Sequence, residues 1–255
     1  MTSDKTSKRV FYIDLIRGFC VLIMICDHFM FDCGYMLPSL SSSPFAQALT
    51  SAAVYYWYHP VRLITRGVII STFYLLCGIS TSLSRNNLNR VLKLFIVCVG
   101  LTIVTYTFDA IFGYQGFVVW FGTLHMLTVA ILLTVLIEFI KNEKIKTVIY
   151  LSSASIMIIL HAIFFDPNRS GIFVGLLGIG YLPFHTGDTV GIMPFVGIVF
   201  IGVVVGKLLK RKRLLKPSAP PTPLRPACFV GRYALLTYIL HQPLLLIIIL
   251  LFSLF

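Results

Sequence analysis

Five charged or titratable side chains that could take part in chemistry lie within or at the end of the first long apolar segment, residues 10–31. They are Asp14, Arg17, Asp27, His28 and Asp32. A charge inside hydrocarbon is costly, so such residues usually face a protein interior or a water-filled path and mark a functional site. A histidine and a carboxylate four residues apart share one face of a helix, where the carboxylate can orient the imidazole as a general base. His28 and Asp32 have this spacing.

The helical repeat extends this pair into a polar stripe along the whole segment. Successive residues of a helix turn by about 100°, which predicts one face made of six residues: Asp14, Arg17, Gly18, Val21, His28 and Asp32. Asp27 points well away from that face. The stripe predicts the wall of a polar pathway across a membrane. For Asp14 and Arg17 a second role stays open, because residues three apart can simply neutralise each other.

Other polar residues in or near apolar segments are less specific. His125, in FGTLHML, is as compatible with hydrogen-bonded packing as with chemistry. His241 lies near the middle of the last apolar segment, and Pro243 after it removes a backbone hydrogen bond and predicts a kink. Arg232 lies at the start of that segment and is typical of a charged anchor. His59 is typical of an ordinary surface histidine.

The composition indicates an integral membrane protein. Of the 255 residues 58% are hydrophobic and 12% are charged, and the mean hydropathy is +0.92. A soluble chain of this length could not cover its surface with so few charges. The net charge of +12 lies mostly in short connections, where it indicates topology and not nucleic-acid binding. The six cysteines lack metal-ligand spacing, so we expect neither a metal site nor a disulfide framework.

About seven stretches are long enough, at roughly 20 residues each, to cross a bilayer as helices. The expected spans are residues 11–31, 65–84, 90–109, 117–140, 146–165, 190–210 and 230–252. Lys and Arg concentrate before the first span and in every second connection after it. By the positive-inside rule the N-terminus is cytoplasmic and the C-terminus extracytoplasmic. The predicted fold class is an all-α polytopic transmembrane helical bundle of the cytoplasmic membrane.

Three connections have a composition of their own. Residues 33–64, expected outside, are rich in Ser and aromatic residues. Residues 167–189 are Gly-rich and are compatible with a short re-entrant or interfacial segment. Residues 211–228 are basic and Pro-rich, which predicts a cytoplasmic loop within a single integral-membrane domain covering residues 1–255. The inverted repeat of many transporters is not visible.

Five segments in order along the chain resemble one protein family. They are IDLIRGFCVLIMICDHFMFD, FYLLCGISTSLSRNNLNR, FGTLHML, Asp188 with the PFVG that starts at Pro194, and GRYALLTYILHQP. Together they are similar to the bacterial branch of the heparan-α-glucosaminide N-acetyltransferase-like membrane proteins, over nearly the whole chain. The resemblance implies a membrane enzyme that moves an acetyl or other acyl group from cytosolic acyl-CoA to an extracytoplasmic sugar or glycan. Eukaryotic members differ at His28, where they have Asn, and their proposed catalytic histidine precedes the second span, nearest to His59.

The implied reaction gives the polar residues roles. His28 would deprotonate the acceptor or carry the acyl group, and Asp32 would hold the imidazole. His125, Arg62 or a backbone amide would stabilise the oxyanion. Cationic side chains at the cytoplasmic mouth would bind the phosphates of the cosubstrate, acetyl-CoA or another acyl-CoA. The candidates for this CoA site are Asp14, Arg17, Arg85, Arg90, Arg232 and His241.

Two other protein classes remain compatible with the sequence. A transporter or flippase for a polar or anionic solute would use the same charges as a pathway without chemistry. A receptor-like or scaffold protein is favoured only by the number of spans. The His28–Asp32 spacing favours the enzyme, and the missing repeat counts against the transporter. The expected partners are the lipid bilayer and a glycan acceptor, not nucleic acid; the oligomeric state, a homodimer included, stays open.

Overall fold

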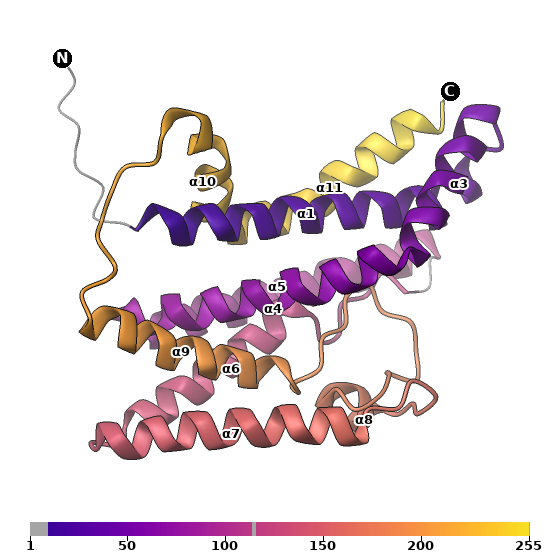
Figure 1. Cartoon of the computed structure of the whole chain (residues 1–255). Coiled ribbons are helices and arrows are strands. Elements are labelled where there is room, and N and C mark those ends of the chain that lie inside the picture. Colours follow the sequence, from indigo (N-terminus) through magenta and orange to yellow (C-terminus); the bar gives the residue numbers. More distant parts are fainter. Residues whose placement is uncertain (1–9, 114–115, 255) are drawn as a thin grey trace. The chain divides into compact units, whose positions relative to one another are not determined.

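The computed structural model describes residues 10–113 and 116–254, and these residues form helices joined by connections of varied length (Figure 1). In chain order the helices are α1 (Phe11–Tyr35), α2 (Leu37–Leu40), α3 (Pro44–Tyr58), α4 (Pro60–Leu83), α5 (Asn87–Phe112), α6 (Thr123–Glu138), α7 (Glu143–Phe164), α8 (Ile172–Leu177), α9 (Phe195–Arg211), the 3₁₀ helix η1 (Thr222–Leu224), α10 (Arg225–Arg232) and α11 (Ala234–Phe252). No strand forms among the described residues beyond isolated bridges. The all-α prediction is confirmed.

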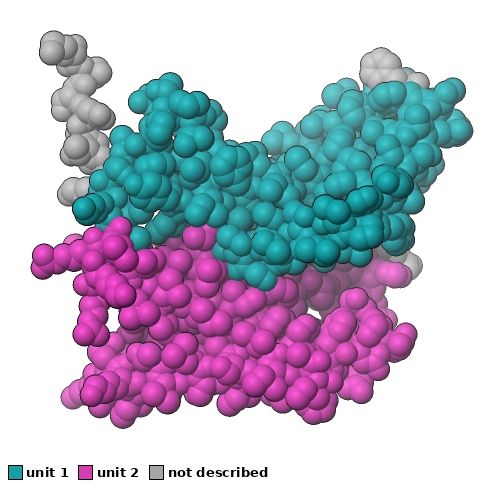
Figure 2. Space-filling model, in the orientation of Figure 1, with its two compact units in different colours: residues 1–73, 215–255 teal, residues 74–214 magenta. Residues whose placement is uncertain are grey.

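The chain divides into two compact units, coloured separately in Figure 2. The first comprises residues 1–73 and 215–255, and the second comprises residues 74–214. Helix α4 begins in the first unit and ends in the second. The first unit therefore contains both α1 and α11.

Four helices in the described ranges are long and apolar enough to cross a membrane: α4, α5 up to Ile111, α7 and α11. Helix α6 is apolar but shorter, with 16 residues. These helices make the chain a membrane protein of helical class. Spans at α1, α6 and α9, the total of seven and the orientation of the termini stay predictions.

Residues 33–64 were interpreted from the sequence as a loop. The structure corrects this interpretation, because these residues contain α2, α3 and the start of α4. The helix start was present in the sequence SSSP. The Ser43 hydroxyl accepts a hydrogen bond from the Ala46 N–H at 3.2 Å, and Pro44 occupies the first helical turn. A serine cap followed by proline is a common helix start. The serine-rich composition masked it.

The last predicted span and the loop before it also differ from the structure. Helix α10 begins at Arg225, inside the predicted loop 211–228, and ends at Arg232. Helix α11 begins only at Ala234, so residues 230–252 form parts of two helices. The Tyr233 backbone between them leaves the helical region of backbone angles, with ψ of 28°.

In the first unit, α1 packs against α3, α10 and α11. Its crossing with α10 is closest where two glycines meet. A Cβ on Gly18 would overlap the carbonyl oxygen of Ala227, and one on Gly231 would overlap that of Asp14. Only glycine permits such contact of two helix backbones, as at many helix crossings in membranes. This crossing places the polar start of α1 against the end of α10.

In the second unit, an ion-pair network joins α6, α7 and α9. Lys146 contacts Glu138 and Glu143 at 2.9 and 2.6 Å, and Lys207 contacts the same two carboxylates at 2.6 and 3.3 Å. The fully buried Tyr150 donates its hydroxyl hydrogen to Glu138 at 2.9 Å. Because each charge has two opposite partners, the network fixes these three helices together at one end.

Candidate active site

The predicted stripe on α1 faces the inside of the first unit. Asp14, Gly18, Val21 and Asp32, four of its six members, are buried. His28 is half-buried, and its ring centroid lies 5.0 Å from that of His241 on α11. Helix α11 therefore adds a second imidazole to the one that the sequence singled out.

Asp32 is held by the residue next to His241. The side-chain amide of Gln242 donates to both carboxylate oxygens of Asp32, at 3.2 and 3.0 Å. Asp32 is 1% exposed, so the hydrogen bonds from Gln242 replace those that its carboxylate would form with water. Sequence reasoning missed Gln242 and placed His241 at the CoA site. The only signal was the adjacency of His241 and Gln242 in an apolar helix, without an indication of their partners.

The hydrogen bonds of His241 define its tautomer. Its Nδ1 lies 2.5 Å from the carbonyl oxygen of Tyr238. A carbonyl can only accept, so Nδ1 carries the proton, and Nε2 of the neutral ring is the basic nitrogen. His241 is 7% exposed and is oriented as a base would be.

At the other end of the stripe, Arg17 is engaged within the protein. Its Nη1 lies 3.1 Å from the Asp14 carboxylate and donates to the carbonyl oxygen of Gly231 at 3.2 Å. Arg232, the next residue after Gly231, is exposed. The Arg17 guanidinium thus links α1 to α10, and Arg232 lies on the surface one residue beyond this contact. The pairing that the sequence left as an alternative for Asp14 and Arg17 is present.

Asp27, which lies off the stripe, belongs to a second polar cluster. Arg62 on α4 donates to both its carboxylate oxygens, at 2.8 and 2.6 Å, and its guanidinium lies 3.6 Å from the ring centre of Trp57. Tyr56 donates to Asp27 at 3.0 Å. Arg62 is 7% exposed. A bidentate, stacked arginine of this kind is a strong fixed contact, so Arg62 serves here to join α4 to α1.

His59 lies at the end of α3 in the same unit. It is half-buried, its Nδ1 accepts the Val61 N–H at 3.3 Å, and its ring lies 5.5 Å from that of Tyr55. These contacts fix the sharp join between α3 and α4. A catalytic role for His59 stays a prediction.

His125 lies in the second unit, where both its ring nitrogens are used. Nδ1 accepts the Gly122 N–H at 3.3 Å, and Nε2 lies 3.2 Å from the Thr102 hydroxyl. The Thr102 hydroxyl donates its hydrogen to the Val119 carbonyl, so Nε2 of His125 donates to the Thr102 oxygen. The Asp188 carboxylate accepts the Thr123 N–H at 2.7 Å. These contacts together build the start of α6, and an oxyanion role for His125 stays a prediction.

The remaining candidates for the CoA site also lie in the second unit. Arg85 is exposed in the connection between α4 and α5. Arg90 donates to the Thr81 hydroxyl at 3.3 Å and to the Asn87 amide oxygen at 3.1 Å. Within the described ranges, no three His, Cys, Asp or Glu side chains gather as metal ligands.

Four helices apolar enough to span a membrane, with buried Asp32 and His241 beside His28 in the first unit, define a polytopic membrane protein with a candidate acid–base site. The family model described as "Heparan-alpha-glucosaminide N-acetyltransferase, catalytic" matches residues 9–243, most of the chain. The chain belongs to this family, which places it among membrane acetyltransferases. Neither the curated proteins nor the solved structures contain a significant match.

Proposed function

We propose that the protein transfers an acetyl or other acyl group from cytosolic acyl-CoA to a hydroxyl or amine of an extracytoplasmic sugar or glycan. The observation that carries this proposal is the placement of His28, Asp32 and His241 within the family match. They lie on two packed helices, with the carboxylate buried and one imidazole already oriented. Family membership alone gives the class of reaction and not its substrates.

In the proposed reaction, His28 takes the proton of the acceptor hydroxyl or amine as the acceptor attacks the thioester carbon. The new C–O or C–N bond forms, the C–S bond breaks, and the CoA thiolate leaves. The imidazolium then returns its proton to the thiolate, so acyl-CoA and acceptor become acylated acceptor and CoA. Asp32 stabilises the transient imidazolium, and Gln242 keeps Asp32 in place.

The structure supports a different place for His241 from the one expected at the sequence level. Its ring lies beside His28, where it can exchange a proton with the base through Nε2. The CoA phosphates are then assigned to cationic side chains. In the first unit these are Arg17, positioned by Asp14, and Arg232. A CoA role for Arg85 and Arg90 of the second unit stays a prediction.

The test is release of free CoA thiol by the purified protein, with acetyl-CoA and glucosamine as probes. His28→Ala should lower kcat about 10²–10⁴-fold, the usual effect of losing a general base, with little change in KM for acetyl-CoA. His59→Ala is the matched control and should retain activity. Full activity in His28→Ala would remove His28 from the mechanism. Loss confined to His59→Ala would move the chemistry to the α3–α4 join, and no thiol release from the wild type on any sugar would favour a transporter.

A further inference from the structure

The second unit contains an open cavity of 650 Å³ whose lining includes none of the residues named in the proposed reaction, so the function proposed above gives it no role. It lies among the end of α5, the α5–α6 connection and the segment before α9. Its lining consists of Tyr106, Asp109, Ala110, Gly116, Val118, Trp120, Phe184 and His185. By the predicted topology both connections are extracytoplasmic. The volume falls within the roughly 300–1,000 Å³ of small-molecule sites.

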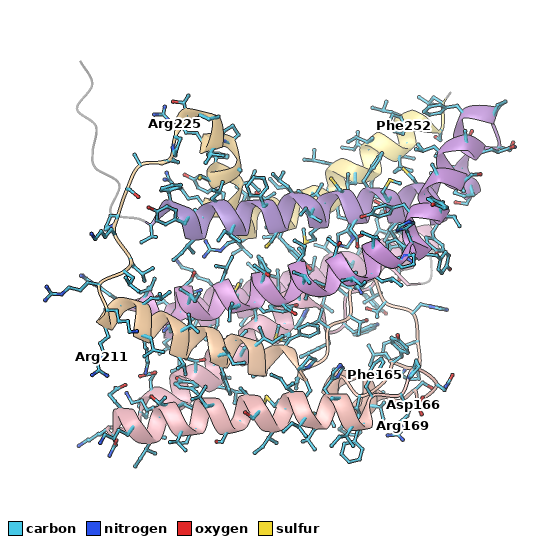
Figure 3. All side chains as sticks on the ribbon, viewed as in Figure 1. Phe165, Asp166, Arg169, Arg211, Arg225 and Phe252 are labelled. Carbon is cyan, nitrogen blue, oxygen red and sulfur yellow. The ribbon has the colours of Figure 1, made fainter. Side chains whose placement is uncertain are left out.

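The walls of this cavity are fixed by hydrogen bonds between the two connections. The Val118 carbonyl accepts from the Gly187 N–H at 3.1 Å and from the Thr186 hydroxyl at 2.7 Å. Farther along, the Val190 N–H donates to the Phe121 carbonyl at 3.2 Å. Two segments far apart in the sequence are thus joined along their backbones, so the cavity is preorganised. Phe165, Asp166 and Arg169, labelled in Figure 3, lie after α7 and are not among its lining residues.

Asp109 organises one wall with its carboxylate. It accepts backbone hydrogens from Gly116, Phe117 and Val118 at 3.2–3.3 Å. Gly116 has φ of 117°, a conformation that favours glycine, and an added Cβ would lie 3.0 Å from the Cβ of His185. Three amides pointing to one carboxylate fold the connection tightly around it and leave a single negative group at the cavity.

Three aromatic rings supply the rest of the recognition surface. The ring of Trp120 lies 6.3 Å from Tyr106 and 6.3 Å from Phe184, both edge-on, and all three are about half exposed. The negative face of an aromatic ring attracts the weakly positive C–H groups of a sugar ring, while carboxylate, phenol and imidazole groups bond its hydroxyls. A lipid chain would offer these polar groups no hydrogen bond, and a phosphate would be repelled by Asp109.

We propose that this cavity binds one ring of a neutral or amine-bearing sugar, stacked against Trp120 and Phe184 and hydrogen-bonded near Asp109 and His185. The choice of a sugar as occupant rests on the proposed function. The chemistry of the lining adds the preference: a uronic acid or a phosphorylated sugar carries the same charge sign as Asp109 and binds more weakly.

Tryptophan fluorescence tests the cavity directly, because the chain has two tryptophans, Trp57 and Trp120. In the full chain with Trp57→Phe, titration with methyl glucoside, glucosamine and glucuronate should change the emission of Trp120 saturably for the first two. Glucuronate should bind more weakly. Phe184→Ala should weaken sugar binding about tenfold, the loss of one ring contact. Phe173→Ala, an exposed ring of α8 outside the cavity, is the matched control and should leave binding unchanged.

The outcomes separate this inference from the proposed function. Sugar binding should persist in His28→Ala, since it requires no acyl transfer. Sugar binding by Phe184→Ala as tight as that of the wild type would overturn the cavity as the sugar site and leave the proposed enzyme intact. Saturable sugar binding without any acyl transfer would support the sugar site and contradict the proposed function. An absent sugar response, together with quenching of Trp120 by lipids brominated in their acyl chains, would show a lipid site and overturn the proposal.

Discussion

On α1, the spacing that puts His28 and Asp32 on one face also puts that face against His241 and Gln242 of α11. The first half of this arrangement follows from a local helical repeat and was predictable from the sequence. The second half joins residues more than 200 positions apart, and no local pattern indicates such a contact. The contact between Asp27 and Arg62 was also missed, because Arg62 was assigned to a loop, whereas the structure places it in α4.

Arg17 is the residue for which binding and structure make opposite predictions. If it binds CoA phosphate, Arg17→Ala should raise the KM for acetyl-CoA strongly, and Arg17→Lys should rescue only part, because lysine lacks the bidentate fork. If it serves only to pair with Asp14, the double change Asp14→Asn with Arg17→Gln should restore both fold and turnover. Thermal-shift titration with CoA on these variants decides. Equal stabilisation of the double variant and the wild type would remove Arg17 from the CoA site.

Among the elements, the long apolar helices were predictable from apolar runs, while their ends and breaks and the helices within the connections were not. The apolar pattern continues through Tyr233, yet α10 ends there and α11 begins, because α10 packs across α1 at Gly18 and Gly231. The composition of residues 33–64 is typical of a loop, so α3 was missed. The capping serine that marks the start of α3 is a single residue, Ser43. The break at Tyr233 depends on a tertiary contact, and the start of α3 depends on a local cap.

The α1–α10 crossing gives a prediction about stability. Gly231→Ala must push α10 away from the Asp14 carbonyl, and it also disturbs the Arg17 contact with the Gly231 carbonyl. Overpacking of this kind costs about 1–3 kcal/mol, so the melting temperature should fall clearly. Gly100→Ala on α5 is the control, since no atom lies within 4 Å of its added Cβ. Equal melting temperatures for the two variants would contradict the close crossing.

For the whole molecule, composition alone established the membrane class, and the family match agrees with it. Sidedness follows from Lys and Arg asymmetry and can be measured in intact cells. With Cys26 replaced by Ser, Ser42→Cys should react with an impermeant thiol reagent, and Ala219→Cys should not. Both positions are exposed, so a difference in labelling reports the side of the membrane and not burial. The reverse pattern would invert the topology and move the α1 base to the other side.

In the proposed reaction, an acyl group from one side of the membrane reaches an acceptor on the other side, with His28 as the base. The direct measurement uses sealed vesicles containing the purified protein, glucosamine trapped inside, and acetyl-CoA with a deuterated acetyl group outside. For molecules whose connection 212–221 faces outward, deuterated N-acetylglucosamine should form inside the vesicles. The product should be absent with His28→Ala. Unlabelled glucosamine leaving the vesicles without acetylation, or labelled product formed equally by His28→Ala, would contradict the proposed reaction.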